Sequence, residues 1–272
     1  MSQPPTAIRI DDPADPRVAA YRDIRERDLV GREGRFVAEG EVVLRMLAAS
    51  SRHRAESVLI DERRLDRLAP LLAALAADTP VYAAGQAVID AIAGFHLHRG
   101  ILAIGRSAPD PGAAALLARL PARALVLALF GLSNHDNMGG AFRNAAAFGA
   151  DAVLIDSGCC DPLYRKAIRV SVGHALTVPF ARLAPVEDPL ALLAEARLEP
   201  LALTPRGATP LAELDPPARA AVLLGTEGEG LPARIIAGSR PVAIPMAPGV
   251  DSLNVAVTAG IVLHHLRFGG RG

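Results

Sequence analysis

The strongest constraint on the fold is a series of short, almost wholly apolar segments that alternate with helix-forming segments after Pro121. The apolar segments predict strands at 125–130, 152–155, 200–203, 221–224 and 242–244. Helices are predicted between and after them, at 140–148, 162–172, 189–196, 231–237 and 253–267. Strands that are apolar on both faces and separated by helices form parallel sheets with helices on both sides. The predicted fold class is therefore α/β with a parallel sheet.

A second, smaller α/β domain is predicted before this series. The segment 106–113 contains two prolines and a glycine, which mark a boundary, so we expect domains at 1–110 and 121–272. In the first domain, strands at 34–40, 57–60 and 81–82 alternate with helices at 21–27, 41–49 and 65–77. His96 and His98 have the spacing of metal ligands on one strand face, but we identify no carboxylate or Cys partner nearby. A loop or RNA-facing position is therefore favoured for both histidines.

The composition excludes several classes of protein. Hydrophobic residues make up 51% of the chain, which suffices for a sizeable core, and the longest apolar runs are far shorter than the ~20 residues of a membrane helix. Residues 1–16 lack the basic and apolar segments of a signal peptide. The two cysteines, Cys159 and Cys160, are adjacent and provide neither a disulfide framework nor a four-ligand zinc site. We expect a soluble cytoplasmic protein without a metal and without a membrane segment.

The acidic and basic residues are equal in number, and almost all of the basic residues are arginine. Lys and Arg together number 29, against 29 Asp and Glu, and Lys166 is the single lysine. Arginine binds phosphate in a bidentate manner and stacks on bases, so a neutral protein of this kind can still bind RNA locally. A genome biased toward Arg codons explains the same composition. In the first domain, two groups of arginines either contact the RNA backbone or form ion pairs on the surface. The first group is Arg22, Arg25, Arg32 and Arg35, and the second is Arg52 and Arg54.

Three loops that follow predicted strands carry unusual residues, and ligands of such sheets bind in these loops. In the first loop, 131–144, we predict that a helix starts near Gly139, with Asn137 and Arg143 on either side of the start and free N–H groups facing an anion. A helix-start Asn and a surface Arg are the alternative interpretation. No Gly-Lys-Ser/Thr occurs in the chain, which excludes the phosphate loop of nucleotide triphosphatases.

The second loop, 225–232, contains three glycines and two carboxylates. Its glycines allow a backbone to approach a ligand, and Glu227 or Glu229 can accept hydrogen bonds from it. Because the glycine spacing is not that of the dinucleotide fingerprint, NAD binding is rejected. An acidic turn before a helix that starts at Pro232 remains the alternative.

The third loop, 244–256, joins a predicted strand to the last predicted helix. Ser252 is predicted to cap that helix. Asn254 is then expected just inside the first turn, where it is a poor helix former, and this placement favours a functional role for it.

Together and in this order, the three loops resemble the signature of the SpoU/TrmH family of RNA ribose methyltransferases, within the SPOUT class. The resemblance covers about 124–268, and the segment 167–173 resembles the family too. The matching residues are Asn137, Gly139, Arg143, Gly225, Glu227, Gly228, Gly230, Ile244, Pro245, Met246, Ser252, Leu253 and Asn254. Where family members often carry Pro shortly before the first Asn, this chain has His135 and Asp136, which leaves the loop shape and the choice of RNA open.

The resemblance implies that the C-terminal segment is threaded through a loop to form a trefoil knot, and that the protein is a homodimer. It also implies that S-adenosylmethionine binds in the knotted loops, held by Thr204, Gly225, Gly230, Ile244, Met246 and Leu253. The catalytic residues it implies are Asn137, Arg143, Glu227, Ser252 and Asn254. The first domain is similar to a small ribosomal-protein-like RNA-binding domain, on the strength of 36–40 and the His-Arg-Gly turn at 98–100.

The reaction implied is transfer of a methyl group to a ribose 2′-hydroxyl of structured RNA, with ribosomal RNA expected before transfer RNA. Arginine stays protonated in proteins, so we expect Arg143 to hold an RNA phosphate and stabilise the developing alkoxide rather than act as the base. Three alternatives remain: a base-methylating enzyme of the same class, a resistance methylase of ribosomal RNA, and a catalytically inactive RNA-binding or ribosome-assembly factor.

Overall fold

The computed structural model describes residues 6–22, 34–226 and 228–269. Its contacts divide the chain into two compact units: Met1–Ala108 with Leu163–Thr177, and Pro109–Pro162 with Val178–Gly272. The N-terminal part of the first unit ends at Ala108, which lies inside the predicted boundary segment 106–113. Nothing in the sequence pattern predicts that the short segment Leu163–Thr177 packs with the first unit.

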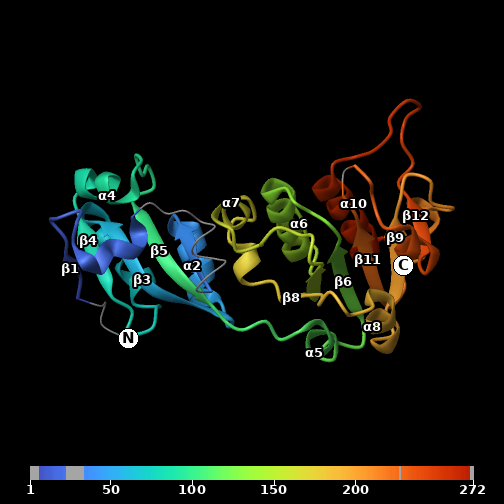
Figure 1. Ribbon diagram of the computed structural model, residues 1–272, viewed down its shortest axis with the longest axis horizontal. Helices are drawn as coiled ribbons and strands as arrows, with labels where there is room; N and C mark the ends of the chain where they lie inside the picture. Colours follow the sequence, from blue (N-terminus) through green and yellow to red (C-terminus); the bar gives the residue numbers. More distant parts are fainter. Residues whose placement is uncertain (1–5, 23–33, 227, 270–272) are drawn as a thin grey trace. The chain divides into compact units, whose positions relative to one another are not determined.

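The first unit is built on a mixed sheet of five strands (Figure 1). The strand order is β1 (Ile8–Arg9), β4 (Val81–Ala84), β3 (His53–Asp61), β5 (Ile101–Ser107) and β2 (Arg35–Glu39). The first three of these strands are parallel, and β5 is antiparallel to both of its neighbours. The helices are α2 (Glu41–Ala49), α3 (Leu65–Leu72) and α4 (Gln86–Ala93). The helix predicted at 21–27 falls outside the described residues except for its first two positions, where Tyr21 ends a 3-10 turn.

The core of the first unit lies between the sheet and the elements that cover one of its faces. Side chains of α4 and of the 3-10 turn Pro16–Tyr21 pack on strands β2, β3 and β5. Tyr21 is fully buried, and its hydroxyl shares a 2.7 Å hydrogen bond with the Ser57 hydroxyl. Burial raises the pKa of Tyr21, so its hydroxyl is neutral near pH 7. The hydrogen bond to Ser57 connects the 3-10 turn to β3.

The segment Leu163–Thr177 contacts β2 and α2 within the first unit. It contains the short helix α7 (Arg165–Val170), whose Arg165 donates to Glu39 at 2.9 Å. Both side chains are largely buried, at 16% and 12% exposure, and the Arg165 guanidinium also lies 4.7 Å from the Phe95 ring centre. A hydrogen bond of 2.7 Å from the Ser50 hydroxyl to the Leu176 carbonyl fixes the end of the segment.

The second unit is built on a parallel sheet of seven strands, which confirms the predicted fold class. The order is β10 (Thr209–Pro210), β12 (Arg240–Ala243), β9 (Glu199–Leu203), β11 (Arg219–Leu224), β6 (Ala124–Leu129), β7 (Ala152–Ile155) and β8 (Phe180–Arg182). Strands β6 and β7 are buried at every position. Helices are α5 (Ala113–Leu117), α6 (His135–Ala147), α8 (Pro189–Glu195), α9 (Ala233–Ala237) and α10 (Val255–Phe268).

The last helix returns to the centre of this sheet. After β12, which pairs with β9, the chain crosses back so that α10 packs against α6 and contacts β6 and β11 (Figure 1). The threading of this segment through a loop stays a prediction from the family resemblance. The return of the last helix brings the third loop, between β12 and α10, next to the first loop, between β6 and α6.

Candidate active site

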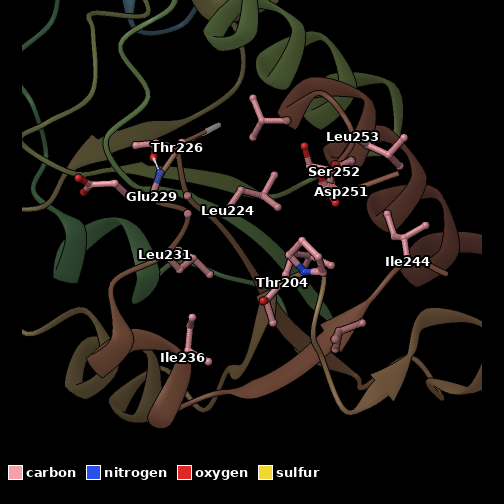
Figure 2. Close-up of a pocket in the computed structure, with 18 of the residues that line it drawn as sticks. Thr204, Leu224, Thr226, Glu229, Leu231, Ile236, Ile244, Asp251, Ser252 and Leu253 are labelled. Atoms are coloured by element: carbon pink, nitrogen blue, oxygen red, sulfur yellow. Dashed lines mark hydrogen bonds between the residues drawn. The ribbon is translucent and has the colours of Figure 1, made fainter. Parts of the chain in front are cut away.

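The main cavity of the second unit lies at the carboxyl ends of three neighbouring strands, β9, β11 and β12, as expected for a parallel sheet. Its volume is about 380 Å³, which suits a small organic ligand. Figure 2 shows its lining, with Thr226 and Glu229 on one side and Asp251 and Ser252 on the other. Residues after each strand and the start of α10 contribute: Leu203, Thr204, Pro205, Leu224, Gly225, Thr226, Gly228, Glu229, Gly230, Leu231, Ile236, Val242, Ile244, Met246, Asp251, Ser252, Leu253, Val255 and Thr258.

One wall of the cavity is a tight turn that begins at Gly225. A Cβ atom at this position would lie 2.2 Å from the Gly230 carbonyl carbon and 2.4 Å from the Leu231 nitrogen. Thr226 pairs with Gly230 in a single β-bridge, and the Thr226 hydroxyl accepts a 3.1 Å hydrogen bond from the Glu229 N–H. Backbone therefore packs on backbone here, and only glycine at position 225 permits this approach.

The first loop is shorter than predicted, because α6 begins at His135 rather than near Gly139. The Asn134 side chain caps the helix by accepting hydrogen bonds from the N–H groups of Asp136 (2.8 Å) and Asn137 (3.4 Å). The prediction of free N–H groups at Gly139 is wrong, since that residue lies inside the helix. Asn137 and Arg143 likewise both lie within α6 instead of on either side of its start.

Glycine inside α6 serves close helix packing rather than loop flexibility. A Cβ at Gly140 would meet the Ala256 Cβ of α10 at 2.7 Å, and one at Gly260 would meet the Asn144 side chain at 3.3 Å. The Asn144 amide donates a 2.6 Å hydrogen bond to the Ala256 carbonyl. The small residues thus allow α6 and α10 to lie close together.

The predicted cap of α10 is corrected by the structure. Asn254, not Ser252, is the N-cap, and its side-chain oxygen accepts from the N–H groups of Ala256 (2.9 Å) and Val257 (3.3 Å). Asn254 therefore lies before the first turn rather than inside it. Its amide nitrogen also donates a 2.8 Å hydrogen bond to the Asn137 side-chain oxygen. Asn137 is 7% exposed and Asn254 is exposed, so this partly buried bond joins the starts of the two helices.

The six positions predicted to hold a cofactor, and Ser252, all line the main cavity. Asn137 lines a second, smaller cavity of about 180 Å³ that shares Thr226 and Gly228 with the first. Arg143 is exposed on α6 and lines neither cavity. Glu227 lies outside the described residues. The individual roles of these residues stay predictions.

Part of the polar lining was not predicted from the sequence. Asp251, Thr226 and Thr258 line the cavity, although for Asp251 and Thr226 only their neighbours in the chain were predicted and Thr258 lies beyond the third loop. Asp251 precedes Ser252 directly, so position in the third loop was the available signal. The apolar lining at Leu203 and Leu224 comes from strand ends, which a search for polar residues in loops does not detect.

The two cysteines lie next to the first loop and do not provide a nucleophile. The Cys159 sulfur accepts a hydrogen bond from the Leu132 N–H at 3.3 Å and donates to the Leu129 carbonyl at 3.3 Å. Burial raises the pKa of Cys159 to about 12 and that of Cys160 to about 11. Both are neutral thiols near pH 7, and Cys159 holds the loop in place.

The described residues contain no group of three or more His, Cys, Asp or Glu side chains arranged to hold a metal ion. One detail of the sequence analysis is wrong: His96 does have a carboxylate neighbour, since its Nδ1 lies 2.6 Å from Asp90. The His96 and His98 rings contact each other edge to face. Within the same described part of the chain, no helix has the length and apolar character needed to cross a membrane.

Comparisons with known proteins agree with this architecture. A solved structure of an S-adenosylmethionine-bound rRNA methyltransferase from Sinorhizobium meliloti has the same fold, with a TM-score of 0.81 at 21% identity, over 98% of this chain and 99% of that one. A structure described as an RNA 2′-O ribose methyltransferase is 27% identical, with a TM-score of 0.72, over 95% and 98% of the two chains. The fold of this chain is therefore shared with solved RNA methyltransferases.

The sequence comparisons identify the family. The model of the SpoU rRNA methylase family matches residues 124–264. An uncharacterized tRNA/rRNA methyltransferase of Mycobacterium tuberculosis is 41% identical over 262 residues, which cover 93% of this chain and 89% of the relative. The chain belongs to the SpoU rRNA methylase family.

Proposed function

We propose that this protein transfers a methyl group from S-adenosylmethionine to a ribose 2′-hydroxyl of structured RNA, with ribosomal RNA the first candidate. The observation that carries the proposal is the convergence of the six predicted cofactor residues, from three separate loops, on one cavity beside the Asn137–Asn254 hydrogen bond. The similar structure described as an RNA 2′-O ribose methyltransferase supports the choice of ribose.

The cavity fits S-adenosylmethionine in size and in chemistry. Leu224, Leu231 and Ile244 provide apolar surface for a planar base, and the turn at Gly225 exposes backbone groups close to a ligand. The hydroxyl of Ser252 and the carboxylate of Asp251 suit a sugar and a cationic ammonium or sulfonium group. The bound cofactor supplies an electrophilic methyl group.

The chain's own part in the reaction is positioning and electrostatic stabilisation. Aligning an acceptor oxygen with a methyl group lowers a barrier by several kcal/mol without a metal. Asn137 and Asn254 hold the starts of α6 and α10 together at the edge of the cavity. The exposed guanidinium of Arg143 binds an RNA phosphate and stabilises negative charge on the ribose oxygen, while the proton passes to water or phosphate. For Glu227, the family resemblance alone supports a role, which is to orient the ribose or Arg143.

A homodimer is part of the proposal. Three large apolar side chains on α10 are solvent-exposed, Val257 at 50%, Ile261 at 40% and Phe268 at 63%, and their spacing of four and seven residues places them on one helix face. A second copy of this chain would bury that face. Light scattering on the purified protein measures its mass in solution. The measurement is made below and above a concentration on the order of 10 μM, the range in which a weak dimer dissociates.

The test of the reaction is transfer from radiolabelled S-adenosylmethionine to total RNA lacking modifications, followed by nucleoside analysis. A labelled 2′-O-methylnucleoside is expected, and separating the RNA species then identifies the substrate. Label on a base instead would assign the protein to base methylation. If neither transfer nor cofactor binding by calorimetry is detected, the inactive RNA-binding alternative replaces the proposal.

A further inference from the structure

The turn that follows β7 holds the backbone of the first loop. Asp156, the residue directly after β7, accepts a 2.9 Å hydrogen bond at Oδ1 from the Gly131 N–H. The Leu132 carbonyl accepts a 2.8 Å hydrogen bond from the Cys160 N–H. The first two residues of the loop are therefore both fixed by the turn at 156–160.

The Asp156 carboxylate has a local contact as well as this distant one. Its Oδ1 atom accepts a 3.0 Å hydrogen bond from the Gly158 N–H, two residues later, which is a common arrangement for aspartate in a turn. The hydrogen bond from Gly131 spans 25 residues and joins the ends of the paired strands β6 and β7. The local contact explains the shape of the turn, but the distant contact acts on another loop.

The loop held by Asp156 borders the cofactor site that we propose. Its first residues line the second cavity together with Asn137, Thr226 and Gly228. Thr226 and Gly228 also line the main cavity, so the two cavities are neighbours. A Cβ atom at Gly131 would lie 2.7 Å from the Thr226 Cγ2 atom. Because the two residues are this close, a displacement of Gly131 changes the boundary between the cavities.

We propose that Asp156 is a positioning residue for methyl transfer, which holds Gly131 and so fixes the wall against which the acceptor ribose is aligned. This inference rests on the proposed function, since it places the cofactor in the main cavity and the acceptor on the side of the second cavity. Asp156 lines neither cavity and acts only through the first loop. Alignment in a group transfer is sensitive to position, and a misplacement on the order of 1 Å costs up to about 10²-fold in rate.

The test measures methyl transfer by Asp156→Ala and Asp156→Asn to the RNA species that the wild-type protein labels. Asp156→Ala is expected to lower kcat about tenfold to a hundredfold, with the KM for RNA and the calorimetric affinity for cofactor changed less than about twofold. Asp156→Asn keeps an acceptor oxygen and is expected to retain kcat within about threefold. A parallel loss of cofactor affinity in Asp156→Ala would show that Asp156 shapes the main cavity and would contradict the proposal.

Asp110→Ala is the matched control in the same unit. Asp110 also accepts one local and one distant backbone hydrogen bond, from the Gly112 N–H at 2.8 Å and from the Arg182 N–H at 2.9 Å. It lines neither cavity. Both alanine variants are expected to melt at a lower temperature than the wild type, whereas kcat falls only for Asp156→Ala. Equal losses of kcat would show that reduced stability, and not the position of the loop, is the cause.

Hydrogen exchange, followed by mass spectrometry, tests the first loop without depending on activity. Peptides covering 130–134 are expected to exchange faster in Asp156→Ala than in the wild type, because the Gly131 N–H loses its acceptor. Unchanged exchange in these peptides would overturn the inference. If the wild-type protein transfers methyl groups and Asp156→Ala keeps the wild-type kcat, the inference is wrong and the proposed function stands. If the wild-type protein methylates no RNA, the proposed function fails and the inference fails with it.

Discussion

The two units place their functional groups in opposite ways. In the second unit, glycines and short neutral side chains converge at one edge of a parallel sheet, where backbone packs on backbone and a cavity remains. In the first unit, the guanidiniums of Arg35, Arg106 and Arg54 come from neighbouring strands of a mixed sheet, paired in register, and Arg35 and Arg106 bind Glu56. A site of the first kind depends on shape to within one methyl group, whereas a site of the second kind depends on charge and weakens as salt is added.

Arg143 offers the sharpest test of this contrast, because it is an exposed arginine in the unit whose site otherwise depends on shape. Arg143→Ala is expected to lower kcat about 10²–10³-fold, as expected when one group that stabilises transition-state charge is lost. Cofactor affinity, measured by calorimetry, should stay within twofold, since Arg143 does not line the cavity. Lost cofactor binding would instead assign Arg143 to the pocket and contradict the contrast.

Gly225→Ala tests the dependence on shape. The new methyl group would overlap the backbone of Gly230 and Leu231, and overpacking of this kind costs roughly 1–3 kcal/mol. We expect cofactor affinity to fall about tenfold to a hundredfold. Gly228→Ala is the matched comparison in the same turn, because a Cβ there meets no atom within 4 Å. Equal losses in the two variants would show that steric fit at Gly225 is not the cause.

The pH dependence of stability examines the buried histidine of the first unit. Folded His53 has a pKa of about 4, below its ordinary value of 6.5, so the unfolded chain takes up a proton first as pH falls. The stabilisation is complete above pH 6.5 and is lost progressively as pH falls toward 4, by about 2 kcal/mol at pH 5. Urea unfolding from pH 7 to 5 should show this loss. His53→Leu should flatten the pH profile, and replacing exposed His98 with Gln should leave it unchanged; a His53→Leu profile as steep as wild type would disprove the assignment.

The smallest effect is expected at the link between α6 and α10. Asn254→Ala removes a helix cap, worth about 1 kcal/mol, and a hydrogen bond to Asn137 of similar size. Asn254→Asp keeps a capping oxygen and loses only the amide donor, so thermal unfolding should place it between wild type and Asn254→Ala. If Asp were as damaging as Ala, the bond to Asn137 rather than the cap would account for the loss.

Much of the second unit could be predicted because its strands are apolar on both faces. The five predicted strands agree with β6, β7, β9, β11 and β12 to within two residues at each end. The other two strands, β8 and β10, have three and two residues, too few for a recognisable pattern. In the first unit, the predicted strands at 34–40 and 81–82 agree equally well with β2 and β4, whereas β3 begins four residues before its predicted start.

The error at the start of α6 has its physical cause in a distant part of the chain. Gly139 and Gly140 predict a loop when only their neighbours in sequence are considered. At Gly140 the glycine allows the approach of Ala256, more than a hundred residues later in the chain, which no local pattern contains. The convergence of the predicted cofactor positions on one cavity could be anticipated only through the family resemblance, because three loops must be brought together by the order of the strands.

The ion pair between Arg165 and Glu39 has a consequence for how the chain can be divided. Because Leu163–Thr177 packs in the first unit, the polypeptide passes from one unit to the other three times. A fragment that stops at residue 110 would leave Glu39 without its guanidinium and the surface of β2 and α2 without its cover. The first unit is therefore not a cassette that evolution or cloning can exchange by a single crossover. A protease cut within 108–113 should leave the two halves of the protein together.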